Sequence, residues 1–121
     1  IDIMEFPNFN VNEVLVNVFW RDTASNIQAD AAWLPGPDYT ADYHVFAIDW
    51  QPNYIIYYID GVERRRITDY TKIPHKPMHL IANFAVGGWA GAVGARPGRA
   101  EKIAYGELLL ATARKFTWRA A

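Results

Sequence analysis

The stretch that decides the fold runs Tyr54-Ile55-Ile56-Tyr57-Tyr58-Ile59-Asp60-Gly61-Val62 and continues to Thr68. Residues 54–59 are apolar on both faces, which is typical of a strand that is covered on both sides. Asp60-Gly61 supplies the positive φ angles of a two-residue hairpin turn, and residues 62–68 lead back as the second strand. The sequence therefore predicts an antiparallel hairpin.

Further short β-prone runs, separated by turn signals, lie on either side of this hairpin. We expect strands at residues 1–6, 11–20, 27–34, 43–50 and 78–86, with turns at 7–10, 35–38 and 51–53. Such a series predicts an all-β fold, an antiparallel β-sandwich. Residues 101–116 differ, because their apolar side chains recur at helical spacing, so a C-terminal helix is expected there.

Composition limits the class of protein. A chain of 121 residues forms at most one domain, and 15% aromatic residues argue against disorder. The formal net charge of −1 indicates neither nucleic acid nor a membrane as partner, and the lack of cysteine excludes disulfides and thiolate sites. No apolar run is long enough for a transmembrane helix. The chain has no signal peptide and does not begin with Met, so we expect a piece of a longer protein.

Three segments share one family pattern. They are Ile1-Asp2-Ile3-Met4-Glu5, then residues 43–50 with 54–61, and finally Ile73-Pro74 through Pro77-Met78 to Gly87-Gly88-Trp89. In this order and spacing they resemble the family 16 glycoside hydrolases, the laminarinase and lichenase group. The first segment looks like the family's catalytic strand Glu-Ile-Asp-Ile-Met-Glu without its leading Glu. The resemblance implies a concanavalin-like jelly roll.

The resemblance also suggests how the chain divides. It covers roughly residues 1–91, and family members are much longer, with the catalytic strand near the middle. Residues 1–91 are therefore expected to form an incomplete jelly-roll domain that begins within the catalytic strand. Eleven acidic and six basic residues precede Arg96, whereas two acidic and six basic residues follow from that position. Residues 92–121 are therefore expected to be a divergent tail.

Retaining glycoside hydrolysis needs a nucleophile and an acid/base, two carboxyl groups about 5–5.5 Å apart. The resemblance implies that Glu5 is the general acid/base and that Asp2 helps to set the ionisation of the nucleophile. The nucleophile itself is expected directly before Ile1, outside this chain. Alternate residues of a strand share a face, so the spacing of Asp2 and Glu5 requires a β-bulge that includes Met4. The alternative is that both are ordinary surface carboxylates.

A sugar site combines aromatic faces with planar polar groups. Trp89 follows two glycines, Asn83 lies in an otherwise apolar strand, and Trp20 ends another strand, so all three are expected to line the cleft. The alternative for both tryptophans is a place in the core, since large aromatics are mostly buried. For Asn83 the alternative is a structural hydrogen bond.

The remaining candidates are expected to be structural. His44 has no Ser or Cys partner pattern, and His75 and His79 lack metal-ligand spacing, so no metal site is predicted from them. Residues 64–66 are three successive arginines, but their side chains would alternate between the two faces of a strand. They therefore do not form a single basic patch for nucleic acid, and a solvated hairpin arm is expected.

By this resemblance, the chain is a piece of an extracellular or periplasmic endo-β-1,3-glucanase or β-1,3-1,4-glucanase that acts with retention. The implied partner is a β-glucan, no cofactor is needed for the chemistry, and the family also allows a structural calcium. Exposed strand edges predict self-association. Little or no activity is expected from these residues alone, because the nucleophile is not among them. A non-catalytic, lectin-like carbohydrate-binding module is the alternative, and a residue without a carboxyl group before Ile1 would favour it.

Overall fold

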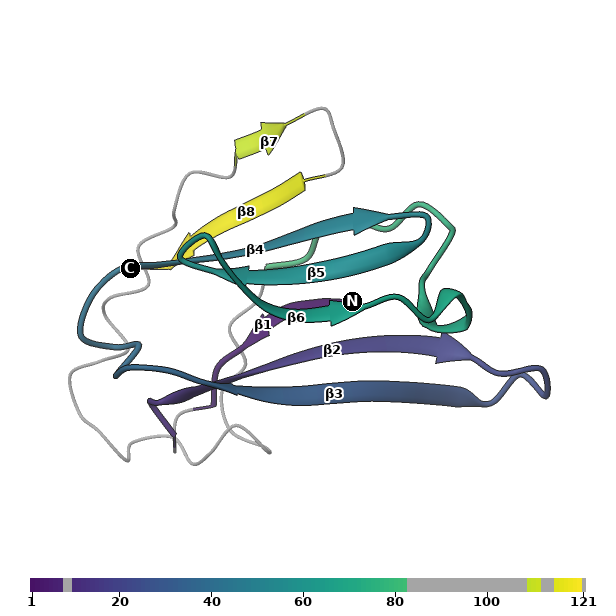
Figure 1. The fold of residues 1–121 in the computed structure, drawn as a ribbon, viewed down its shortest axis with the longest axis horizontal. Helices are drawn as coiled ribbons and strands as arrows, with labels where there is room; N and C mark the ends of the chain where they lie inside the picture. The colour runs from purple at the N-terminus through teal and green to yellow at the C-terminus, as the bar shows by residue number, and fades with distance from the viewer. Residues whose placement is uncertain (8–9, 83–108, 112–114, 121) are drawn as a thin grey trace.

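The computed structural model describes residues 1–7, 10–82, 109–111 and 115–120. These residues form two antiparallel sheets (Figure 1). The three-stranded sheet has the order β1-β2-β3, and the five-stranded sheet has the order β6-β5-β4-β8-β7. The strands are β1 (Asp2–Glu5), β2 (Glu13–Arg21), β3 (Ile27–Pro35), β4 (His44–Gln51), β5 (Tyr54–Ile59), β6 (Val62–Ile67), β7 (Leu109–Ala111) and β8 (Lys115–Ala120). The predicted all-β, antiparallel architecture is confirmed.

The β5–β6 hairpin forms as the sequence predicts. Asp60 and Gly61 have φ angles of 52° and 79°, the left-handed values that a two-residue turn of this kind requires. Ile55, Ile56 and Tyr57 of β5 are all buried, so this strand is covered on both faces. One irregularity follows the turn, because the register between β5 and β6 shifts between Tyr57 and Tyr58.

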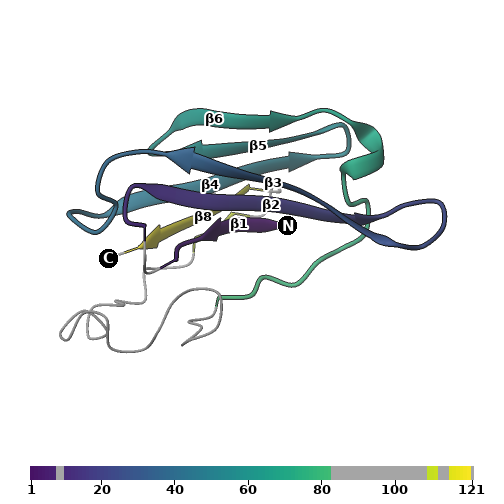
Figure 2. The same cartoon turned by 90° about the horizontal axis from the view of Figure 1, so that it is seen from below.

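The two sheets face one another across the hydrophobic core, as the two views together show (Figures 1 and 2). Val14, Val16 and Val18 of β2 supply one side of this core. Tyr57 supplies part of the other side, and its hydroxyl donates to the carbonyl oxygen of Asn17 at 3.0 Å. Full burial of such apolar side chains stabilises the fold by about 1.5–3 kcal/mol each. This packing holds β2 in place, and β1 pairs with β2.

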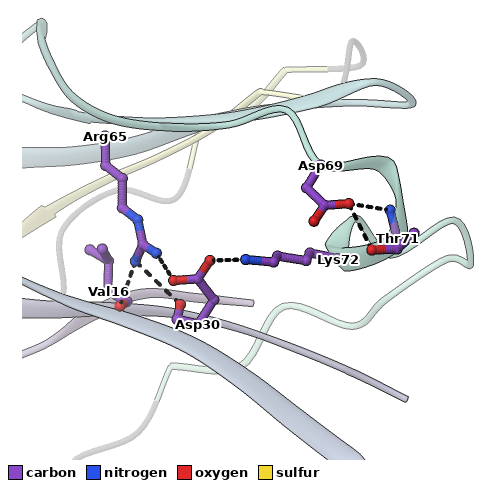
Figure 3. A network of polar contacts seen from close by, with 6 residues as sticks. All are labelled: Val16, Asp30, Arg65, Asp69, Thr71 and Lys72. Carbon is purple, nitrogen blue, oxygen red and sulfur yellow. Dashed lines mark hydrogen bonds and ion pairs between the residues drawn. The ribbon is translucent and has the colours of Figure 1, made fainter. Parts of the chain in front are cut away.

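A polar clamp also joins the sheets (Figure 3). Arg65 pairs with buried Tyr57, so its side chain points into the sandwich, where it forms an ion pair with Asp30 of β3. Lys72 of the short η1 helix (Tyr70–Lys72) binds the other carboxylate oxygen of Asp30 at 2.8 Å. Arg66, by contrast, forms an ion pair with Glu63 at the exposed surface. The expectation of a solvated arm is therefore wrong for Arg65, whose charge is held between the sheets.

Two expectations about the C-terminal half need correction. The predicted helix over 101–116 conflicts with strands β7 and β8, which occupy the described part of that segment. Phe116, Thr117 and Trp118 are β-prone, and β8 pairs with the edge of β4 that β5 leaves free, which overrides helical periodicity. The predicted strand 78–86 is also not seen over its described part, because residues 78–82 have no strand assignment and are exposed.

Candidate active site

β1 carries both predicted catalytic residues, and its pairing is irregular between them. Asp2 pairs with Asn17 of β2 and Glu5 pairs with Leu15, so one extra residue is present on β1. This is a β-bulge. The two residues inside it, Ile3 and Met4, both pack against the core. The bulge predicted from the Asp2–Glu5 spacing is confirmed.

The bulge places both carboxylates on the same side of the sheet. Ile1 and Phe6, which flank them, pack against the core, as do Ile3 and Met4 between them. Asp2 and Glu5 therefore project from the opposite side, away from the sandwich interior. In a regular strand, two residues separated by this spacing would point to opposite sides.

We call the side of the three-stranded sheet that carries Asp2 and Glu5 the open face. Residues paired directly across antiparallel strands share a face, so Leu15 and Asn17 lie on it with their partners on β3. Two rows result, each crossing three strands. The Glu5 row consists of Glu5, Leu15 and Trp33, and the Asp2 row consists of Asp2, Asn17 and Ala31.

Both carboxyl groups hold their protons to a higher pH than they would in water. Burial raises the pKa of Asp2. Burial also raises the pKa of Glu5, and the negative charge of Asp2 raises it further. A general acid must keep its proton near the working pH, so the direction of the Glu5 shift suits that role.

Asn17 is a feature of the site that sequence reasoning missed. It is buried beside Asp2, and its Oδ1 accepts no hydrogen bond from any residue that the structure describes. An unpaired buried acceptor costs about 1–3 kcal/mol, so it marks a place where a donor is expected to bind. The signal in the sequence is a single Asn between Val16 and Val18 of an otherwise apolar strand.

The structure does not bring Trp20 to the carboxylates. Trp20 lies on the core side of β2 with Val18 and packs against the core, and the Nζ of Lys72 lies 5.4 Å from its ring centroid. Strand alternation decides this, because Trp20 is in phase with the buried valines. The exposed tryptophan of the open face is Trp33, which the sequence analysis did not single out. Asn83 and Trp89 lie outside the described residues, so their roles stay predictions.

His44 has a structural role, as expected. Its Nδ1 lies 2.7 Å from Oδ2 of Asp60, in the β5–β6 turn, and the other oxygen of Asp60 accepts from the Val45 amide at 2.8 Å. These contacts tie β4 to the hairpin turn.

Two absences apply to the described part of the chain only. No three of its His, Asp or Glu side chains gather in a way that could hold a metal ion. A structural calcium stays a prediction, because calcium also takes backbone carbonyl oxygens as ligands. Its one helix is the η1 turn, and no helix there is long and apolar enough to cross a membrane.

With this geometry in place, comparison with known proteins identifies the family. Residues 1–107 match the sequence profile described as glycosyl hydrolases family 16. The chain belongs to this family. Its members share the jelly-roll architecture, and the two antiparallel sheets are consistent with part of one. The match runs beyond residue 91, where the resemblance read from the motifs ended, to residue 107.

Several curated relatives are similar over part of their length. A "Beta-glucanase" of Rhodothermus marinus is 33% identical over 109 residues, which is 80% of this chain and 38% of the relative. A "Beta-glucanase" of Paenibacillus polymyxa is 39% identical over 71 residues, 54% of this chain and 29% of the relative. The "Endo-1,3-1,4-beta-glycanase EglC" of Rhizobium meliloti is 29% identical over 92 residues, 75% of this chain and 19% of the relative. The chain thus spans well under half the length of these relatives. No solved structure matches it significantly.

Proposed function

We propose that this chain carries the acid/base part of a retaining β-glucanase active site. The observation that supports this is the bulge between Asp2 and Glu5, which sets both carboxylates on the open face while Ile3 and Met4 stay in the core. The raised pKa of Glu5 agrees with a group that must donate a proton. Asp2 supports Glu5 through its charge and acts as a positioning residue.

The proposed reaction is a double displacement. A nucleophilic carboxylate attacks the anomeric carbon while Glu5 donates its proton to the departing glycosidic oxygen, so the C–O bond breaks and a glycosyl ester forms. Glu5, now ionised, takes a proton from a water molecule that attacks the same carbon. The ester C–O bond breaks, which frees the sugar and restores the nucleophilic carboxylate. The position before Ile1 is two residues from Asp2, so in a continuous strand a Glu there would share the open face and serve as nucleophile.

The proposed substrate is a β-glucan with internal β-1,3 or mixed β-1,3-1,4 bonds. Two of the relatives above are named as β-glucanases and the third as an endo-1,3-1,4-β-glycanase, and the bulged spacing favours the laminarinase type of the resemblance. Because carboxyl groups perform every proton transfer and the nucleophilic step, the chemistry uses no cofactor. A polymeric substrate does not enter cells, which favours an extracellular or periplasmic place of action.

The experiment uses the longest chain that the gene encodes around these residues, with laminarin and lichenan as substrates. Glu5→Gln is expected to lower kcat by about 10²–10⁴, because the leaving oxygen loses its proton donor. A glucoside with a dinitrophenyl leaving group needs no protonation, so its first step should stay close to wild type. A proton NMR time course is expected to show the β-anomer first. Unchanged hydrolysis of laminarin and lichenan by Glu5→Gln would refute the assignment.

The 121 residues alone are expected to bind glucan weakly and to hydrolyse it little or not at all, because no nucleophile precedes Asp2 within them. If the longest encoded chain binds glucans but shows no hydrolysis, the lectin-like module becomes the better description.

The outer edges of β3 and β6 have no neighbouring strand among the described residues, which supports a proposal of self-association. Light scattering at increasing protein concentration tests it.

A further inference from the structure

The open face carries one large aromatic side chain that the proposed reaction leaves unused. Trp33 of β3 is paired with Leu15 of β2, and Leu15 is paired with Glu5 of β1, so all three stand in one row across the sheet. Neighbouring strands are about 4.8 Å apart, so Trp33 stands roughly 10 Å from Glu5, measured across the strands. A short run of linked sugar units spans that distance.

The surroundings of Trp33 leave its ring accessible. Its exposed fraction is 42%, although tryptophan rings are usually well covered. Its same-face neighbours along β3 are Ala31 and Pro35, which are both exposed and smaller than the indole ring. Among the residues that the structure describes, no other aromatic ring packs against it, whereas Tyr39 contacts Phe6, His44 and Phe46.

We infer that Trp33 is a stacking platform for a glucosyl unit of the chain whose scissile bond lies at Glu5. The proposal rests on the proposed function, because Glu5 fixes one end of the row. The indole offers a flat apolar face to the apolar face of a pyranose ring, and its ring nitrogen can donate to a hydroxyl group. Leu15 lies between the two ends as an apolar floor, and Asn17 and Asp2 lie in the adjacent row as polar neighbours.

The direction of the row determines what Trp33 recognises. A glucan that follows the Glu5 row crosses the strands and reaches Trp33 only if it extends beyond the units next to the cleaved bond. Trp33 therefore favours longer chains over short oligosaccharides and acts in binding, not in chemistry. The wild-type protein should bind a hexasaccharide much more tightly than a disaccharide.

The test measures the binding of β-glucan oligosaccharides by calorimetry, in the longest encoded chain. Trp33→Ala is expected to lose about tenfold or more in affinity for a laminari-hexasaccharide, which is a change of about 1.4 kcal/mol. Its affinity for the disaccharide should stay unchanged. Trp33→Tyr keeps a flat ring and should retain most of the affinity, whereas Trp33→Leu keeps apolar volume without a flat face and should behave like Trp33→Ala.

The matched control is Ile27→Ala. Ile27 is an exposed apolar residue of the same strand and the same face, but it pairs with Arg21 and lies outside the Glu5 row. The Ile27→Ala variant should bind both oligosaccharides like the wild type.

If the wild type binds glucan and Trp33→Ala binds the hexasaccharide equally well, the platform is refuted and the proposed function stands. If Trp33→Ala instead dissociates an oligomer without a change in sugar affinity, Trp33 serves a second copy of the chain and the platform is refuted. If the wild type neither binds nor hydrolyses β-glucans, the proposed function fails with it.

Discussion

Removing the carboxylate at the centre of the polar clamp should destabilise the protein by about 2 kcal/mol. Asp30 accepts from Arg65 and Lys72, and the three side chains keep exposed fractions of 27%, 14% and 30%. Breaking a fully buried ion pair costs about 3–5 kcal/mol, and an exposed pair contributes about 0–1 kcal/mol. Partial exposure to water places Asp30→Asn between these limits. The remaining partners of Arg65 are the carbonyl oxygens of Val16 and Asp30, at 3.5 and 3.2 Å.

Urea and thermal unfolding measure this cost. For a chain of this length, 2 kcal/mol corresponds to a loss of roughly 8 °C in Tm. Glu63→Gln is the control, because Glu63 pairs with Arg66 at the exposed surface, and its midpoint should stay at the wild-type value. Asp30→Asn leaves both Arg65 and Lys72 without a carboxylate partner, and the double variant Asp30→Asn/Arg65→Met removes the more buried of these two charges, so part of the stability should return relative to Asp30→Asn.

The same variant has a defined dependence on pH. The hydrogen bond from Lys72, with the charges of Arg65 and Lys72, lowers the pKa of Asp30 in spite of burial. Its folded-state pKa therefore lies below the unfolded value of about 3.9. The stability that Asp30 contributes is fully present above that pH and is lost as the pH falls through the folded-state pKa. Wild type and Asp30→Asn should converge in strong acid. Equal stability at pH 7, or a gap that widens in acid, would refute the role of the clamp.

Three further outcomes follow from single residues. Asp2→Asn removes a negative charge beside Glu5 and should lower the Glu5 pKa, although burial still keeps that pKa above its usual value. NMR titration of the Glu5 carboxyl carbon measures this change. The alkaline limb of the pH–rate profile should move to lower pH with it. Gly61→Ala should cost about 1–2 kcal/mol in urea unfolding from backbone strain alone, because its φ is 79° and an added Cβ meets no atom within 4 Å. Gly36→Ala should cost about 1–3 kcal/mol for a different reason, because its Cβ would collide with the ring and hydroxyl of Tyr39; Gly36→Ala combined with Tyr39→Leu should regain part of that loss.

The sequence predicted features that depend on neighbouring residues. Asp60-Gly61 specifies its turn through local backbone angles, and the structure has the expected positive φ at both positions. The Asp2–Glu5 spacing specified a bulge once the family pattern was recognised. Both features involve only a few consecutive residues, so no knowledge of the opposite sheet was needed.

Features that depend on distant partners were missed. β8 is a strand because β4 offers it an edge, which the helical periodicity of residues 101–116 could not reveal. Arg65 turns inward because Asp30 lies on the other sheet. Trp20 was expected in the cleft but packs against the core, and Trp33, for which no role was predicted, lies on the open face, since a tryptophan looks the same in sequence on either face of a strand. The phase of the buried valines on β2 settles the face of Trp20, and cross-strand pairing then settles that of Trp33.

The bulge links the stability of the fold to the geometry of its site. Without it, the spacing of Asp2 and Glu5 would direct one carboxylate into the core, where an unpaired charge is strongly unfavourable. With it, Ile3 and Met4 are both partly buried against the core, and each contributes a part of the about 1.5–3 kcal/mol that a fully buried apolar side chain provides. Hydrophobic packing on the core side of the sheet therefore holds the bulge in place. The carboxylates need no contact with one another to stay on the open face. A change in the core at Met4 should consequently disturb the position of Glu5 more than a change at the exposed surface would.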